Sequence, residues 1–371
     1  MTSKNKITYI ATNIFPSKAA NNIHIFNICT ELFKMNMLER LVIRGNYIFQ
    51  NRLRSEAGIK KIFSQMTEFD IKFLPNTRGL KGNLFSLILS FFLRKIENKN
   101  VYTRSLEVAF KCVKRNNVII EIHAPPNNER EKKYLKELIK ENIKIVVISN
   151  ALKKHLVNKW EAHPERITVL PDASTEIVFS KQELEIYNQK YQQPIDVCYV
   201  GHLYKGRADI IPEIGKLNQK LKIKIIGGNK KDIEFLKSKS TKNVEFLGHV
   251  PYKEARYLMN NSKILLAPYN ASSSTEHGIQ TSEWLSPLKI FEYMQSKSII
   301  IASELPVLKE VLNQENAIFC NIKSTETWEE KITEILNNYS DYLYLAENAY
   351  IDSKKYTWQK RAEKIIHLYD R

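Results

Sequence analysis

The sequence predicts an α/β protein with two domains, each built on a parallel β-sheet that carries helices on both faces. Short apolar runs of β-like residues alternate along the chain with longer amphipathic stretches, and this alternation is typical of βαβ units. The chain has 371 residues, of which 43% are hydrophobic, and this is enough for two cores of ordinary size.

The predicted strands fall into two groups along the chain. Each run is short, apolar and rich in β-branched residues, as is typical of strands buried on both faces of a sheet. The first group comprises Ile7–Ala11, Leu41–Ile43, Ile71–Leu74, Val101–Thr103, Val118–Ile122, Ile145–Ile148 and Ile167–Leu170. The second group comprises Val197–Val200, Ile223–Ile226, Val244–Leu247, Ile264–Ala267, Ile299–Ala302 and Ala317–Phe319.

A polar segment that ends in proline, Leu184–Pro194, is the predicted linker between the two groups. The predicted domains are therefore residues 1–183 and 195–355. The tail Tyr356–Tyr369 is basic and amphipathic, which predicts a final helix. The Ser- and Thr-rich segment Ala271–Ser282 is predicted to be a mobile loop.

The net charge of +17 is concentrated in the N-terminal half of the chain. Residues 1–190 contain 32 Lys and Arg against 18 Asp and Glu, while the remaining residues are nearly balanced. Such an excess favours a polyanionic partner or an anionic membrane surface. A soluble protein from a lysine-rich proteome is the alternative interpretation.

Several classes of protein are disfavoured by motif and composition. The four cysteines lie far apart and form no Cys-x-x-Cys pair, which favours a reduced cytosolic protein over a disulfide or zinc scaffold. No signal peptide is recognisable, and the longest apolar run, Leu84–Leu93, is too short to cross a bilayer. Walker, dinucleotide-binding, zinc-protease and nucleophile-elbow motifs do not occur in the sequence.

The most informative segment is residues 286–296. Ser286 is a good N-cap and Pro287 is favoured at the first helical position, so a helix is expected to begin here. The positive end of that helix, together with Lys289, would suit a diphosphate, and Glu292 one turn later could accept hydrogen bonds from ribose hydroxyls. An ordinary capped helix with no ligand is the alternative.

The order of residues in this region resembles the nucleotide-sugar-binding core of glycosyltransferase family 4. The resemblance rests on Leu-Lys-Ile-Phe-Glu-Tyr-Met (288–294), Ile-Ile-Ala-Ser-Glu-Leu-Pro (300–306) and Glu-Val-Leu (310–312). Glu292 matches the second Glu of the family's Glu-x7-Glu motif, whereas the first falls on Trp284. The resemblance implies the GT-B fold, with two Rossmann-like domains facing a cleft. It also implies that the last helix, 356–371, crosses back to the first domain.

Further residues of the predicted donor site follow the strands of the second domain. In the turn Gly201–Arg207 the glycines allow close backbone approach, while Lys205 and Arg207 supply charge for phosphate. The turn resembles the family's diphosphate clamp, with His202 in place of its Arg. The resemblance also implies donor contacts from Gly228, from Val250 to the base, and from the helix start at Ser286, Leu288 and Lys289. A simple βα turn is the alternative at Val250.

In the first domain, strand alternation places Glu121 and His123 on one face of a predicted strand, at its carboxyl end. The family often has a His here, so the resemblance implies that His123 orients the transferred sugar. A purely structural histidine is the alternative. The resemblance also implies that Arg104 and the loop residues Asn22 and His24 lie on the acceptor side.

These resemblances together imply a retaining glycosyltransferase. It would move a sugar from a nucleoside-diphosphate sugar to a saccharide or lipid-linked acceptor, in cell-surface polysaccharide or glycolipid synthesis. His123, Lys205, Arg207 and Glu292 are the residues expected to serve catalysis, and no metal or other cofactor is expected. A GT-B sugar-nucleotide epimerase, with carboxylate acid/base residues, and a basic nucleic-acid-binding protein are the alternatives.

The basic first domain also predicts where the enzyme works. Leu84–Leu93 and Arg52–Phe63 combine apolar residues with flanking cations, as helices that lie in a membrane interface do. We therefore expect a cytoplasmic protein, peripheral on the inner face of the cytoplasmic membrane. For Leu84–Leu93 alone, a buried core helix is the favoured alternative.

Overall fold

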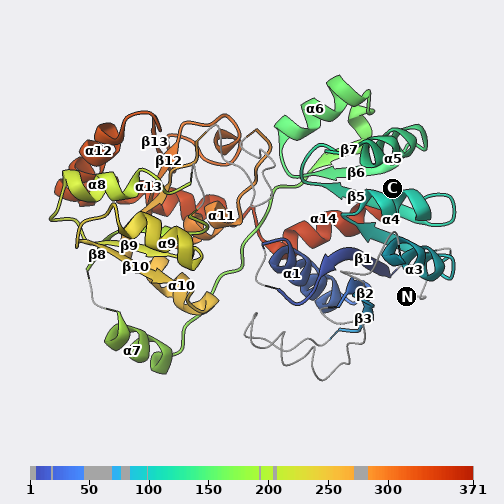
Figure 1. The fold of residues 1–371 in the computed structure, drawn as a ribbon, viewed down its shortest axis with the longest axis horizontal. Helices are drawn as coiled ribbons and strands as arrows, with labels where there is room; N and C mark the ends of the chain where they lie inside the picture. The colour runs from blue at the N-terminus through green and yellow to red at the C-terminus, as the bar shows by residue number, and fades with distance from the viewer. Residues whose placement is uncertain are drawn as a thin grey trace. The chain divides into compact units, whose positions relative to one another are not determined.

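A computed structural model describes residues 6–17, 20–45, 69–76, 84–97, 99–191, 194–203, 207–270 and 283–370. The chain divides into two compact units (Figure 1). The first unit contains Met1–Pro171 together with Trp358–Arg371, and the second contains Asp172–Thr357. Each unit is a parallel α/β domain, which confirms the predicted fold class.

In the first unit, seven described strands form one parallel sheet in the order β3-β2-β1-β4-β5-β6-β7. The register is regular at the centre, where Thr8 pairs with Val101 and Val101 pairs with Val118. The strands are β1 (Ile7–Ile14), β2 (Leu38–Arg44), β3 (Ile71–Leu74), β4 (Asn100–Thr103), β5 (Asn117–Ile122), β6 (Lys144–Val147) and β7 (Ile167–Val169).

In the second unit, six described strands form a parallel sheet in the order β10-β9-β8-β11-β12-β13. The strands are β8 (Ile195–Val200), β9 (Ile223–Ile226), β10 (Val244–Gly248), β11 (Ser262–Ala267), β12 (Ile299–Ser303) and β13 (Ile318–Cys320). Every strand predicted from the sequence is therefore present, with ends that differ by at most a few residues.

Helices connect the strands in both units, as the alternating pattern predicts. The first unit contains α1 (Ala20–Lys34), α3 (Leu84–Leu93), α4 (Leu106–Cys112), α5 (Glu129–Lys140), α6 (Asn150–Trp160) and α14 (Trp358–Asp370). The second contains α7 (Lys181–Lys190), α8 (Ile211–Leu217), α9 (Lys230–Lys237), α10 (Tyr252–Asn260), α11 (Leu288–Gln295), α12 (Thr325–Asn337) and α13 (Tyr339–Ser353). Among the described helices, none combines the length and the apolar character that a membrane span requires.

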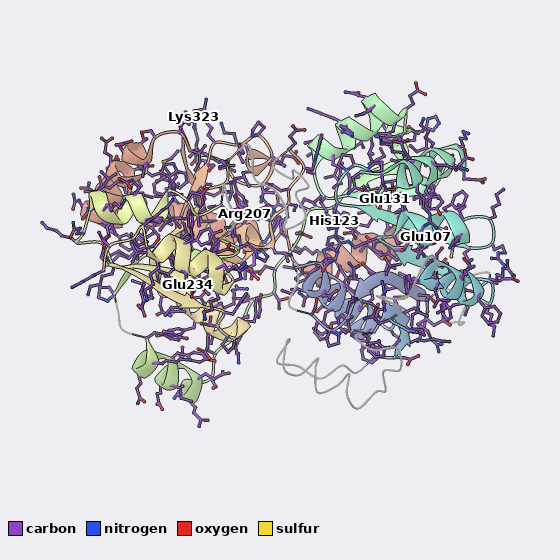
Figure 2. All side chains as sticks on the ribbon, viewed as in Figure 1. Glu107, His123, Glu131, Arg207, Glu234 and Lys323 are labelled. Carbon is purple, nitrogen blue, oxygen red and sulfur yellow. The ribbon has the colours of Figure 1, made fainter. Side chains whose placement is uncertain are left out.

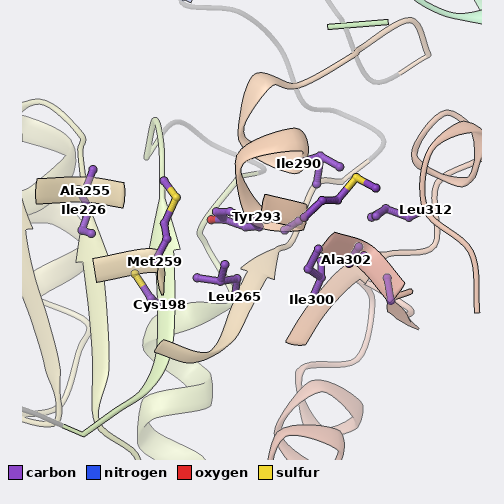
Figure 3. Close-up of a cluster of buried hydrophobic side chains, with 14 of the residues drawn as sticks. Cys198, Ile226, Ala255, Met259, Leu265, Ile290, Tyr293, Ile300, Ala302 and Leu312 are labelled. Carbon is purple, nitrogen blue, oxygen red and sulfur yellow. The ribbon is translucent and has the colours of Figure 1, made fainter. Parts of the chain in front are cut away.

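The second sheet is buried on both faces. Along β11, Leu265 and Ala267 join one hydrophobic cluster, whereas Ile264 and Leu266 join another. Figure 3 shows part of the first cluster, in which Leu265 lies near Tyr293 of α11. This alternation across a continuous apolar run is the reason that the run forms a central parallel strand. All four cysteines of the chain are buried and free.

The final helix belongs to the first unit, as the resemblance implied. Trp358 at its start is 2% exposed, and α14 lies beside α1. The helix is held from the sheet as well, because Lys144 Nζ at the start of β6 donates to the carbonyl of Leu368 at 2.6 Å. A segment more than 180 residues away in sequence therefore completes the first unit.

The predicted linker Leu184–Pro194 is wrong, because most of it is helix α7. Ser180 and Glu183 form a reciprocal capping box, with distances of 3.2 Å and 2.8 Å between backbone nitrogen and side-chain oxygen. Tyr257 also donates to Asn188 at 2.5 Å, which ties α7 to α10. The compact units meet at Pro171–Asp172 and Thr357–Trp358, so the predicted domain bounds, 1–183 with 356–371 and 195–355, differ from them.

Candidate functional site

Both sheets have a topological switch point, where successive strands begin to be added on the opposite side. It lies between β1 and β4 in the first unit and between β8 and β11 in the second. Open parallel sheets bind ligands at the carboxyl ends of the strands at such a point. Arg104 follows β4 and Gly201 follows β8, so predicted site residues of each unit lie at its switch point.

Helix α11 begins one residue later than the sequence predicted. Pro287 is the N-cap and provides no side-chain hydrogen bond, so the prediction of Ser286 as N-cap is wrong. The Ser286 hydroxyl instead accepts a hydrogen bond from the backbone N–H of Asp172 at 2.9 Å. No side chain in the described part of the chain therefore caps the first turn of α11, which begins at Leu288.

Lys289 is a buried cation with no described carboxylate within ion-pair distance, although the charge of Glu292 in the next turn acts on it. Its residue is 9% exposed, and Nζ lies 4.0 Å from the ring centroid of Tyr199 and 4.6 Å from that of Tyr269. Burial, and then the charge of Arg207, hold the pKa of Lys289 well below its usual range. The two rings stabilise the ammonium only in part, so the site favours an added anion.

Two glycines of the predicted donor site have backbone conformations that side chains disfavour, and one of them lies beside this cation. Gly201 has φ of +146°, and a Cβ there would lie 3.5 Å from Lys289 Nζ. Gly228 has φ of +80°, and a Cβ there would lie 2.4 Å from Cδ1 of Leu203. Both positions therefore require glycine, and at Gly201 the exposed backbone lies directly beside Lys289.

Of the other predicted donor residues, Arg207 is the one that the structure places near Lys289. The guanidinium carbon of Arg207 lies 5.4 Å from the Tyr269 ring centroid, so Arg207 and Lys289 share one aromatic neighbour. His202 is exposed, and its carbonyl accepts a hydrogen bond from Tyr199 at 2.6 Å. Val250 is partly buried and packs against the apolar core of the second unit. Lys205 lies outside the described residues.

Glu292 occupies the next turn of α11 and is held by residues that the sequence did not suggest. Its Oε1 accepts a hydrogen bond from the Tyr252 hydroxyl at 2.8 Å, and Arg256 in turn donates to that hydroxyl at 3.3 Å. Burial raises the pKa of Glu292. Within the described residues no hydrogen bond is made to Oε2, which leaves one carboxylate oxygen available to a hydroxyl donor.

In the first unit, Glu121 is the centre of a buried polar cluster. The carboxylate is 1% exposed, Oε1 lies 3.1 Å from Nη2 of Arg361, and Oε2 lies 3.4 Å from Nη1. His24 Nε2 lies 3.0 Å from Oε1, His123 Nε2 contacts Oε1, and the Tyr102 hydroxyl donates to Oε2. Burial opposes ionisation, but the charges of Arg361, His24 and His123 outweigh it and hold the pKa of Glu121 well below its usual range.

The predicted pairing of Glu121 and His123 on one strand face is therefore present, and His24 of α1 joins them. The His24 ring centroid lies 5.2 Å from that of His123 and 5.0 Å from that of Trp358. Asn22 Nδ2 donates to the Ile14 carbonyl at 2.7 Å and fixes the connection between β1 and α1, and its acceptor-side role stays a prediction.

The ligand atoms of His24, Glu121 and His123 all lie within 4.8 Å of one another, a spacing that could suit a metal ion. The guanidinium of Arg361 lies 3.1 Å from the same Oε1, so the carboxylate charge is already balanced by a fixed cation. A metal would have to compete with that ion pair. The expectation that no metal is needed stays a prediction.

A cavity of about 470 Å³ opens beside this cluster. It lies at the carboxyl ends of β1, β4 and β5 and reaches the start of α5. Figure 2 labels Glu107, His123 and Glu131, which come from three segments of its wall. The cavity therefore brings together two residues predicted separately, Arg104 and His123.

Comparison with known proteins gives a family match in the second unit and structural matches along nearly the whole chain. Residues 194–338 match the family model described as Glycosyl transferases group 1. The phosphatidylinositol N-acetylglucosaminyltransferase GPI3 subunit of Saccharomyces cerevisiae is 20% identical over 239 residues, covering 61% of this chain and 50% of that protein. The glycosyltransferase MJ1069 of Methanocaldococcus jannaschii is 25% identical over 238 residues, covering 61% and 58%. The chain thus matches about half the length of these relatives.

Among solved structures, HepE of Anabaena in complex with UDP and glucose superimposes with a TM-score of 0.73 and 11% sequence identity. The alignment covers 98% of this chain and 99% of HepE. At this identity the likeness speaks for the fold, which is GT-B. Residues 194–338 therefore form a domain of the glycosyl transferases group 1 type, in a chain that has the two-sheet GT-B fold of solved glycosyltransferases.

Proposed function

We propose that the protein is a retaining glycosyltransferase of family 4. The second unit would bind a nucleoside-diphosphate sugar, and the first would bind a saccharide or a lipid-linked acceptor. The product would serve cell-surface polysaccharide or glycolipid synthesis. The family model matched by residues 194–338 supports sugar transfer, and the sequence motif around Glu292 supports the family assignment.

The proposal rests chiefly on Lys289, a cation in the first turn of α11 that makes no ion pair with a described residue. Lys289 is buried beside two tyrosine rings, Arg207 lies close by, and no described carboxylate pairs with Lys289. A diphosphate would supply the missing negative charge. During transfer its charge grows as the sugar departs, so these cations would bind the transition state more tightly than the ground state.

The remaining residues are given the roles that their contacts allow. Glu292, held by Tyr252, would accept a hydrogen bond from a ribose hydroxyl through its second carboxylate oxygen. His123, held by Glu121, would orient the transferred sugar, and Arg104 would contact the acceptor. Lys205 keeps its proposed role on the diphosphate, and we propose that the reaction needs no metal.

The names of similar proteins are in keeping with this proposal. HepE was solved with UDP and glucose, and the yeast relative is named for transfer of N-acetylglucosamine to phosphatidylinositol. A uridine nucleotide is therefore the first donor to test, and a phosphate-bearing lipid is the first acceptor class to test.

The deciding experiment measures binding and hydrolysis across a panel of nucleotide sugars. We expect calorimetry to detect binding of one nucleoside diphosphate, and mass spectrometry to detect slow release of the sugar from the matching donor. Release should persist in EDTA, because the proposed leaving-group stabilisation comes from side chains. A donor returned with an altered sugar would indicate the epimerase instead, and failure to bind any nucleotide would contradict the proposal.

The Glu292→Ala variant tests the ribose contact. Loss of a hydrogen bond to a charged group should weaken nucleoside diphosphate binding by roughly 1–3 kcal/mol. Inorganic pyrophosphate lacks the ribose, so its affinity should not change, and this makes it the matched control. Equal weakening of both ligands, measured by calorimetry, would remove Glu292 from the ribose site.

Helix α3 supports the proposed location on the inner face of the cytoplasmic membrane. Leu89 and Leu93 are buried, whereas Leu87 is 66% exposed and Phe91 is 64% exposed. One face of α3 is therefore in the core, as the core-helix interpretation expects. The other face is in solvent, where a membrane surface could contact it. Lys95 Nζ lies 4.8 Å from the Phe91 ring centroid, so a cation accompanies the exposed apolar face, and anionic lipid would complement it.

Sedimentation with liposomes tests this location. Wild-type protein should bind vesicles that contain anionic lipid, and binding should fall as salt rises because surface charges are screened. Phe91→Ser should weaken binding strongly. Phe235→Ser is the matched control, because Phe235 is 57% exposed in the second unit and also has a lysine, Lys239, 4.0 Å from its ring centroid. Equal effects of the two substitutions would contradict a role for α3, and the segment 52–63 lies outside the described residues.

A further inference from the structure

The cavity of the first unit contains a cation that its surroundings leave without a partner. Arg104 lines the cavity, and its Nη1 is fully buried yet makes no hydrogen bond. Within the described residues no carboxylate forms an ion pair with it. Burying a guanidinium nitrogen without a hydrogen-bond acceptor costs free energy. An arginine in such a position therefore points to a ligand that supplies the acceptor.

A second donor without a partner lies near Arg104. Tyr9 of β1 is fully buried, and its hydroxyl has no hydrogen-bond partner in the described part of the structure. The charge of Arg104 acts on Tyr9, which places the two side chains within electrostatic range of each other. Tyr9 is not among the residues that line the cavity, and the charge of Glu121 also acts on it, so Arg104 is the donor that an anion in the cavity would complete.

Two carboxylates of the cavity wall, Glu107 and Glu121, are already paired with cations other than Arg104. Arg130 lies 3.1 Å from Glu107, which also pairs with Lys111 at 2.6 Å. Glu121 is paired with Arg361, as described above. Glu131, at the start of α5, is partly buried and accepts a hydrogen bond from the backbone of Asn127 at 3.3 Å, but no described cation forms an ion pair with it. Among the described residues that line the cavity, Arg104 is thus the arginine that forms no ion pair.

The cavity has the size and the neighbours of a substrate site. Its volume of about 470 Å³ falls within the usual range for small-molecule pockets. His123 lines the same wall and is 22% exposed at its side chain, so a ligand on Arg104 would lie in the same cavity as the proposed sugar-orienting histidine. The planar fork of an arginine suits phosphate and carboxylate oxygens in particular.

We infer that this cavity binds the acceptor through an anionic group, a phosphate or a carboxylate, that pairs with Arg104. This inference rests on the proposed function, because it assigns the chemical class of the acceptor. The same group could belong to a lipid phosphate or to an acidic sugar, and the probes below separate these two sources.

The test is calorimetric titration of the full chain with four probes. They are glucose 1-phosphate, glucuronate, neutral glucose, and a short-chain phosphatidic acid below its micellar concentration. At least one anionic probe should bind roughly tenfold or more tightly than glucose. Preference for phosphatidic acid would assign a lipid phosphate, and preference for glucose 1-phosphate or glucuronate would assign an acidic sugar. Equal affinity for glucose and all three anions would overturn the inference.

Variants assign the binding to Arg104. Arg104→Gln should abolish the preference for anions, and Arg104→Lys should retain part of it because it keeps the charge without the fork. Arg115→Gln is the matched control, because Arg115 is an arginine of the same unit that pairs with Glu97 and is not among the residues lining the cavity, so its replacement should leave the preference intact. An Arg104→Gln protein that is folded by circular dichroism and still prefers anions would contradict the inference, as would an Arg104→Lys protein with no residual preference.

These measurements distinguish failure of the anionic-acceptor inference from failure of the glycosyltransferase proposal. Nucleoside diphosphate affinity should be the same in wild type and in Arg104→Gln. Intact nucleotide binding with no preference for anionic probes would reject the acceptor class alone. Anion binding that depends on Arg104, in a protein that binds no nucleotide, would reject the glycosyltransferase proposal and leave the anion site standing.

Discussion

The Lys289→Met variant is expected to lose nucleoside diphosphate affinity by roughly tenfold to 150-fold, the range for a lost charged hydrogen bond. It should at the same time become more stable. Lys289 is 9% exposed and makes no ion pair with a described residue, so the folded second unit keeps this charge at the cost of its burial unless an anion binds beside it. Methionine keeps the length of the side chain and removes that charge, with an expected gain on the order of 1 kcal/mol.

The same residue makes donor binding depend on pH. Burial lowers the pKa of Lys289 in the folded protein, so the unfolded chain holds this proton to higher pH than the folded chain does. Stability contributed by this group therefore rises with pH between the two pKa values. A bound diphosphate reverses the shift and draws a proton to the amine, so donor affinity should fall as pH rises through the alkaline range.

Calorimetry in buffers of different ionisation enthalpy measures this proton uptake directly. The uptake should be present in wild type and absent from Lys289→Met. Lys309→Met is the matched control, because Lys309 is an exposed lysine of the same unit with an aromatic neighbour, Phe319, at 5.4 Å, and it pairs with Glu304. A Lys289→Met protein that binds nucleotide normally, or that is less stable than wild type, would contradict the proposed role.

Much of the donor site was predictable because its parts are local in sequence. Lys289 and Glu292 lie within one helical turn of each other, and Gly201 directly follows a recognisable strand. Tyr199 and Tyr269 were not predicted, because their rings reach Lys289 only once β8 and β11 are neighbours. The Ser-x-x-Glu pattern at Ser180 is a known signal for the start of a helix. It was missed because the polar composition of the segment favoured a linker.

The cluster around Glu121 was less predictable, since it joins segments from the whole length of the chain. Strand alternation was enough to place Glu121 beside His123. Nothing local links Glu121 to Arg361, which lies 240 residues later and reaches the carboxylate only because α14 packs in the first unit. Long-range ion pairs of this kind are invisible to patterns that are read within one element.

Replacing Arg361 is expected to be the most destabilising single change in the first unit. Arg361→Met leaves the buried Glu121 carboxylate without its fixed cation, a loss of about 3–5 kcal/mol for a broken buried pair. The double variant Glu121→Gln with Arg361→Met should recover part of this, because the uncompensated charge is gone. Arg115→Met is the matched control, because Arg115 lies 3.4 Å from Glu97 in an exposed pair worth about 0–1 kcal/mol.

The pH dependence of this loss has a definite sign. The pKa of Glu121 is held well below its usual range in the folded protein, so its stabilising effect is full above the unfolded glutamate pKa of about 4.3 and is lost as pH falls through the folded value. In Arg361→Met the carboxylate lacks the cation that lowers its pKa and therefore protonates more readily. The deficit should therefore be greatest near neutral pH and shrink on acidification.

Hydrogen exchange reports each unit separately, which makes it the suitable measurement. Protection in β5 and α14 should fall in Arg361→Met by the stated free energy, while β11 and β12 of the second unit serve as the internal reference. A deficit that stays constant between neutral and acidic pH would show that Arg361 acts through packing and through its hydrogen bonds to the carbonyls of Leu170 and Pro171, and not through Glu121. Loss of protection in Glu121→Gln with Arg361→Met as large as in the single variant would show the same, because the buried charge would then carry no part of the cost.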